Sequence, residues 1–199
     1  MRKSKAIMII GALLLLALFV FPLWNITLEA PQYPDPLGMN IWINKITDQE
    51  PNDIKNINLM NHYVGMKEIP EHMPEFDIFP KVIIAMSVMG IIIGFVGRRG
   101  LYVTWFVVMS ILGAAGMYDF YLWEYEYGHN LNENAAIKFL DDQGNPLDYQ
   151  PPLFGTEVIL NFIARSYPST GAYFLFSGMM LSLVAFYVDK KEEQKNEIT

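Results

Sequence analysis

The sequence predicts an all-α membrane protein with four transmembrane helices, whose two extracytoplasmic loop regions form a small mixed module. Three observations predict this fold class. Four long apolar stretches divide the chain, and the basic residues gather beside the ends of those stretches. Hydrophobic residues make up 52% of the 199 residues, which is more than a soluble domain of this length usually contains.

The first apolar stretch, within residues 1–24, predicts an N-terminal signal-anchor helix. Its apolar part runs from about Lys5 to Trp24 and holds roughly 20 residues, enough at about 1.5 Å each to cross a hydrocarbon core of about 30 Å. A cleaved signal peptide is the alternative, because the chain begins with the basic segment MRKSK. The anchor is favoured because no A-x-A cleavage site follows and because the apolar run is long for a signal peptide.

Residues 79–123 predict a transmembrane helical hairpin. The second helix is expected from about Phe79 to Gly97, and the third from about Leu101 to Trp123. Only the segment Arg98-Arg99-Gly100 separates them, so the tip of the hairpin is tight and lies at one membrane surface.

Two groups of small residues mark either expected contacts between helices or glycines that are simply tolerated in them. Gly90 and Gly94 form a GxxxG motif in the second helix, and residues 113–116 form a patch of glycine and alanine in the third. Backbones approach one another closely at such patches, and helices pack there in lipid.

Residues 170–199 predict the fourth transmembrane helix, from about Thr170 to Val188, followed by a cytoplasmic tail. Lysine and arginine are enriched in short cytoplasmic segments, so their positions give the orientation. Eight of the 14 lie beside the predicted spans, at Arg2, Lys3, Lys5, Arg98, Arg99, Lys190, Lys191 and Lys195. With four spans these positions share one side, and we expect a multi-pass protein of the bacterial inner membrane with both termini in the cytoplasm.

The two loop regions, residues 25–78 and 124–169, are then extracytoplasmic. Residues 25–78 carry nine acidic residues and three lysines, which is either a plain consequence of topology or a surface that collects cations. Residues 39–43 alternate like a short strand. Residues 157–165 carry an apolar stripe that predicts a helix lying in the membrane interface.

Histidines and methionines of the loops are the candidate metal ligands. The chain has no cysteine, which excludes thiolate sites, disulfides and haem attached through CxxCH. Imidazole and thioether without thiolate suit copper among the common metals, so copper is the one candidate cofactor. His62 and Met66 are four residues apart, on one face if the segment is helical, although Gly65 disfavours such a helix. The predicted metal ligands are His62, Met66, His72, Met73 and His129.

The same residues also have a purely structural interpretation. Met39 and Met60 add two thioethers to the loops, but methionine is also an ordinary packing residue, and histidines in loops often only form hydrogen bonds. Asp119, near the outer end of the third helix, is costly at membrane depth. We expect it to pair with Lys81 of the neighbouring helix.

Several classes of function are excluded or disfavoured. The net charge of −7 argues against nucleic acid as a partner. The sequence has no GxSxG, HExxH, Walker or dinucleotide motif, so we do not expect an enzyme. A transporter is disfavoured because four spans are few and because their interiors lack charged residues.

Two segments, WNITLEAPQYPDPLGMNIWIN and INLMNHYVGMKEI, resemble the small polytopic membrane proteins encoded beside nitrous oxide reductase in clade II nos gene clusters. The resemblance covers these segments and the four-span layout. It implies an accessory part in nitrous oxide reduction and denitrification, through copper-site maturation or electron supply. It supplies no catalytic residues.

The sequence therefore predicts an accessory integral membrane protein that assists copper-site maturation or electron supply for nitrous oxide respiration. The alternative is a structural scaffold subunit of a membrane complex that binds no metal. The expected partners are membrane lipid and a protein on the extracytoplasmic side, and a homo-oligomer is left open. Nucleic acid is not expected.

Overall fold

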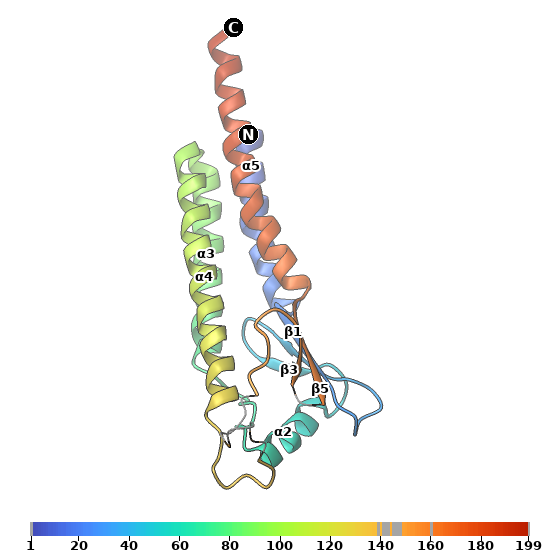
Figure 1. The fold of residues 1–199 in the computed structure, drawn as a ribbon. Coiled ribbons are helices and arrows are strands. Elements are labelled where there is room, and N and C mark those ends of the chain that lie inside the picture. The colour runs from blue at the N-terminus through green and yellow to red at the C-terminus, as the bar shows by residue number, and fades with distance from the viewer. Residues whose placement is uncertain (1, 139, 141–143, 145–148, 160, 199) are drawn as a thin grey trace.

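The helices form a long bundle, and a five-stranded sheet with one further helix lies at one end of it (Figure 1). The computed structural model describes residues 2–138, 140, 144, 149–159 and 161–198, and the backbone alone for 195–198. The elements in chain order are α1 (Lys3–Leu14), η1 (Leu15–Phe19), β1 (Trp24–Glu29), β2 (Leu37–Ile41), β3 (Ile46–Asp48), α2 (Asp53–Val64), α3 (Glu75–Val96), α4 (Arg99–His129), β4 (Gly155–Ile159), β5 (Phe162–Pro168) and α5 (Thr170–Ile198).

The predicted all-α fold class with four transmembrane helices is wrong. Within the described residues, five α-helices accompany a five-stranded sheet, and three helices, α3, α4 and α5, are long and apolar enough to cross a membrane. The first apolar stretch does not form one long helix. It is α-helical to Leu14 and becomes a 3-10 helix that ends at Phe19. Pro22 follows, and in a continuing α-helix its ring would clash with the carbonyl of Leu18.

Two helices, α3 and α4, form at the predicted hairpin, and both are longer than expected. Gly97 ends α3 in the left-handed conformation, with φ at 72°, which glycine adopts without steric cost. The α3 helix begins at Glu75 instead of Phe79, because acidic residues in the first turn interact favourably with the helix dipole. The α4 helix continues past Trp123 because its last turns pack against the sheet.

Glycines allow helices of the bundle to approach one another closely. A Cβ atom added to Gly90, in the GxxxG motif, would lie 2.7 Å from Cβ of Ala12 in α1, so the predicted contact of this motif is confirmed. Gly11 and Gly178 bring α1 and α5 together, and a Cβ on Gly178 would lie 2.6 Å from the carbonyl oxygen of Gly11. The predicted contact at residues 113–116 is wrong within the described part of the chain, because a Cβ added to either glycine there meets no atom within 4 Å.

The sheet has the order β3-β2-β1-β5-β4, and all neighbouring strands are antiparallel. The predicted strand at 39–43 overlaps β2, which begins and ends two residues earlier. The predicted interfacial helix at 157–165 is wrong, because β4 and β5 form a hairpin there. Along β5 the residues alternate, with Ala164 and Ser166 buried and Arg165 between them paired with Glu29 on the opposite face.

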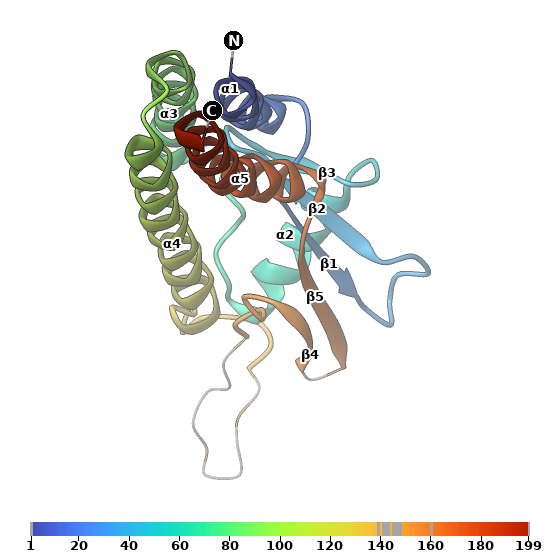
Figure 2. The ribbon, with the colours of Figure 1, turned by 90° about the horizontal axis from the view of Figure 1, so that it is seen from above.

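Two apolar cores follow from this arrangement. The bundle core contains Trp105 of α4, whose indole Nε1 donates to the carbonyl of Met86 in α3 at 3.0 Å. The second, which we call the sheet core, lies between the sheet, α2 and the last turns of α4, and it includes Ile26, Met39 and Tyr127. Seen from above, α3 and α4 lie on one side of the bundle, α1 and α5 on the other, and the sheet extends away beneath them (Figure 2).

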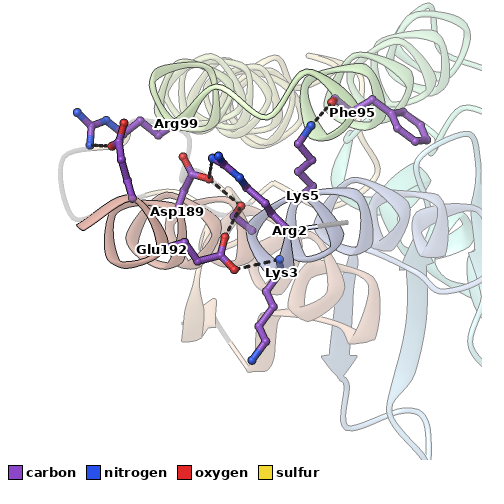
Figure 3. A network of polar contacts seen from close by, with 9 residues as sticks. Arg2, Lys3, Lys5, Phe95, Arg99, Asp189 and Glu192 are labelled. Atoms are coloured by element: carbon purple, nitrogen blue, oxygen red, sulfur yellow. Dashed lines mark hydrogen bonds and ion pairs between the residues drawn. The ribbon is translucent and has the colours of Figure 1, made fainter. Parts of the chain in front are cut away.

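The N-terminus, the α3–α4 tip and the C-terminal helix meet at the end of the bundle away from the sheet (Figures 1 and 3). Ser4 Oγ donates to Asp189 Oδ1 at 2.8 Å. Lys5 Nζ donates to the carbonyl of Phe95 at 2.8 Å. Arg99 pairs with a glutamate of α5 at 2.7 Å. The three basic stretches of the sequence therefore share one end of the molecule.

Candidate functional site: a cavity between the sheet and α4

A cavity of about 110 Å³ lies in the sheet core. Strands β1, β2, β4 and β5 form one wall, α2 and the loop after it form a second, and the last turns of α4 form a third. Most of the lining side chains are aliphatic, aromatic or thioether groups. A cavity of this size accepts a small ligand or a few waters.

The last turns of α4 lie outside the part of the helix that could cross a membrane. At about 1.5 Å per residue α4 extends about 46 Å, whereas a hydrocarbon core is about 30 Å thick. Phe120, Trp123 and Tyr127 follow one another at helical spacing and pack in the sheet core. Glu124 lies on the same stripe, and this places a carboxyl group in an apolar wall.

Glu124 is the most unusual group of this wall. Its side chain is completely buried, with 0% exposure, and neither carboxylate oxygen has a hydrogen-bond partner among the described residues. Burial raises the pKa of Glu124 to about 8, because an apolar surrounding disfavours the charged form. The indole Nε1 of Trp123, which also lines the cavity, is likewise buried and without a partner among those residues.

Three methionines from separate segments line the same cavity. Met39 belongs to β2 and lies opposite Ile26 of β1. Met60 lies in the last turns of α2, and Met66 follows that helix. Gly65 ends α2 in the left-handed conformation, with φ at 84°. The amide of Met66 then donates to the carbonyl of Asn61 at 2.9 Å, which turns the Met66 side chain back toward the sheet core.

Polar contacts hold α2 in place against the sheet. The buried carboxylate of Asp53 accepts hydrogen bonds from the amides of Gly38 and Glu50, both at 2.9 Å. Asp48 accepts from the amide of Ile54 at 2.7 Å. These bonds satisfy one amide in β2, one in the turn before α2 and one in the first turn of α2, and they fix the helix beside β2, which carries Met39.

The structure separates the five predicted metal ligands. Met66 lines the cavity, but His62 is exposed on α2, beside the ring of Tyr63. The His62–Met66 pair does not share a helical face, because Gly65 ends the helix between them. Within the described residues, no group of three or more His, Asp or Glu side chains could hold a metal ion.

The other three predicted ligands lie on different segments. His72, in the loop before α3, is exposed and faces Asp77 at 3.2 Å. Met73 follows it and is half-buried. His129 ends α4 and stacks on the ring of Tyr125, with 3.9 Å between the ring centroids.

The expected ion pair of Asp119 with Lys81 is not formed. Both residues are described, and none of the ion pairs found among the described residues joins them. Lys81 is exposed on α3.

Sequence reasoning missed Glu124 and Trp123 as residues of interest. A signal was present, since Phe120, Trp123, Glu124 and Tyr127 are spaced as one face of a helix. Glu124 is the one acidic residue on this aromatic face, and that exception is the feature of the sequence that pointed to it. The sequence did not indicate which distant segments would cover it.

Comparison of the chain with protein-family models, with curated proteins and with solved structures found no match.

Proposed function

We propose that the chain is an accessory integral membrane protein that holds a folded module at the extracytoplasmic surface as a docking platform for a partner protein in nitrous oxide respiration. The pathway in this proposal rests on the resemblance of the two loop segments. The docking role rests on the way the sheet is joined to the helices.

The observation that supports the docking role most directly is the junction between sheet and bundle. The two neighbouring strands β1 and β5 both continue into bundle helices, and a single residue, Ser169, separates β5 from α5. The Ser169 amide donates to the carbonyl of Leu23 at 2.9 Å, and the Gly171 amide donates to the carbonyl of Pro22 at 2.8 Å. A module joined in this way keeps a fixed orientation relative to the helices, which suits a platform.

The distribution of charge supports the proposed orientation in the membrane. The end of the bundle away from the sheet carries Arg2, Lys5 and the Arg98–Arg99 tip, and basic residues are retained on the cytoplasmic side. The sheet module then faces the extracytoplasmic space of a bacterial inner membrane, and the tail after α5 is cytoplasmic.

Crosslinking in intact cells tests the docking role. A tagged chain is crosslinked in cells that respire nitrous oxide, purified after mild solubilisation, and its partners are identified by mass spectrometry. The Gly171→Val variant loosens the junction, because a Cβ at Gly171 would lie 2.7 Å from the carbonyl oxygens of Phe21 and Pro22. Gly113→Val is the matched control, since a Cβ there meets nothing within 4 Å.

We expect one extracytoplasmic partner with the unaltered chain and with Gly113→Val, and loss of that partner with Gly171→Val. A chain that is recovered without a specific partner contradicts the docking role. A partner retained equally by Gly171→Val contradicts the importance of the junction.

Copper-site maturation is the second candidate function. The observation that favours it is the convergence of Met39, Met60 and Met66 on one cavity, because thioethers favour copper(I). The five ligands predicted from sequence contribute only Met66 to this group.

A further inference from the structure

We propose that the cavity in the sheet core is a copper(I) site, in which the thioethers of Met39, Met60 and Met66 bind the ion and the Glu124 carboxylate balances its charge. The inference deepens the second candidate function. It does not depend on the docking role, because it concerns binding by the isolated protein.

The donor set matches a soft, singly charged ion. Thioether sulfur is a soft ligand that favours copper(I) over zinc, magnesium or calcium. The chain has no cysteine to compete for such an ion. Methionine has a long, flexible side chain, so sulfurs from β2, α2 and the loop after α2 are able to close around an ion within about 110 Å³.

The buried carboxyl gives the cavity a charge that a cation requires. An isolated cation in an apolar interior is strongly disfavoured, and an opposite charge nearby reduces that cost. Glu124 is the one acidic side chain that lines the cavity in the described part of the chain, and its oxygens have no other hydrogen-bond partner there. The ring of Trp123 is also in the wall, and aromatic faces attract cations.

An ion has a route to these ligands along α2. Met60 and Met66 are half-buried, whereas Met39 is 5% exposed. Met60 Sδ accepts a hydrogen bond from the exposed Gln32 side chain at 3.3 Å. The Met60 sulfur is therefore reachable from the surface, and it would receive the ion before Met39 does.

An uncharged apolar ligand is the competing occupant. It would account for the aliphatic and aromatic walls, and the Glu124 and Trp123 groups would serve as its hydrogen-bond partners. Copper(I) is favoured because it also accounts for three thioethers from three separate segments around one cavity.

A competition titration tests the site directly. The metal-free full-length chain in detergent, kept under reducing conditions, is titrated with copper(I) in the presence of bicinchoninate, a chelator whose copper(I) complex is coloured. We expect one copper(I) per chain. The variants Met39→Leu, Met60→Leu and Met66→Leu keep the side-chain volume and remove the sulfur, and each is expected to weaken binding about tenfold or more. Glu124→Gln is expected to weaken it about tenfold.

Two control variants distinguish the cavity from copper(I) binding elsewhere on the chain. Met73→Leu removes a half-buried thioether outside the cavity, and His62→Ala removes the exposed imidazole of α2. Both are expected to bind copper(I) like the unaltered chain. X-ray absorption of the loaded protein is expected to show sulfur neighbours without a histidine nitrogen shell.

Several results would overturn the proposal. The unaltered chain could fail to compete with the chelator, the three cavity variants could bind as tightly as it does, or Met73→Leu could lose as much affinity as they do. A rise in melting temperature with a short-chain quinone and none with copper(I) would assign the cavity to an apolar ligand instead. Partner capture in cells is independent of all these outcomes, so the docking role and the copper site fail separately.

Discussion

The buried Glu124 carboxyl makes the stability of the metal-free protein fall as the pH rises. In the folded chain the pKa of Glu124 is about 8, against 4.5 for an ordinary glutamate. Between these values the unfolded chain has released a proton that the folded chain still holds, so raising the pH favours unfolding. The contribution of the protonated Glu124 carboxyl to the free energy of unfolding is fully present below about pH 4.5 and is lost as the pH passes 8. It amounts to about 5 kcal/mol, because one pKa unit corresponds to about 1.4 kcal/mol.

The variant Glu124→Gln removes this titration with little change of shape. We expect the variant and the unaltered chain to unfold alike near pH 5, with the variant more stable by up to about 5 kcal/mol at pH 9. For a chain of this length that difference corresponds to a melting temperature higher by roughly 10–20 °C.

Thermal unfolding followed by tryptophan fluorescence, in detergent with a metal chelator, measures the difference from pH 5 to 9. Glu126→Gln is the matched control, because Glu126 is an exposed neighbour whose pKa is lowered by its hydrogen bond to Lys67. Its profile is expected to parallel that of the unaltered chain over this range. Parallel profiles for Glu124→Gln as well would refute the assignment of a buried, unpartnered carboxyl.

Two further predictions concern the packing of the bundle and the attachment of α2 to the sheet. Gly178→Ala is expected to destabilise the protein by about 1–3 kcal/mol through overpacking against α1. The control Gly113→Ala is expected to be neutral or stabilising by up to about 1 kcal/mol. Melting temperatures compare the two variants, and equal values would contradict the close α1–α5 contact. Asp53→Ala removes the acceptor of the Gly38 and Glu50 amides, the first of which is buried, and is expected to cost about 2 kcal/mol. Denaturant unfolding beside the exposed Asp35→Ala variant measures this cost. A loss no larger than in that control would show that α2 is held by other contacts.

The helical hairpin could be predicted because apolar length is a local property of the sequence. The residues from Phe79 to Trp123 need no distant partner to form helices, and Gly97 marks the turn between them. The same reasoning failed for the first stretch, because its apolar residues continue without a break into β1. Trp24, Ile26 and Leu28 alternate with polar residues, but the strand is defined by pairing with β2 and β5.

The β5 strand shows why the sheet was missed. Residues 157–165 fit an apolar stripe of period 3.6, and the alternation of Ala164 and Ser166 with Arg165 fits a period of 2 equally well. The choice between them is made by β1, whose residue Thr27 lies opposite Arg165 although the two are far apart in the chain. The cavity was beyond prediction for the same reason, since its walls come from four separate regions of the sequence.

The β1–β5 ladder also divides the molecule mechanically. Backbone hydrogen bonds join these two strands from Trp24 to Glu29. Ser169 alone separates β5 from α5, and residues 20–23, which link η1 to β1, are bonded to that junction through the Ser169 and Gly171 amides, so we expect α1, the sheet and α5 to move together. The last turns of α4 meet the sheet through the side chains of Phe120, Trp123 and Tyr127, a softer connection. The cavity lies at this side-chain contact between α4 and the sheet. A small displacement of α4 would therefore change the volume of the cavity without breaking a strand pair.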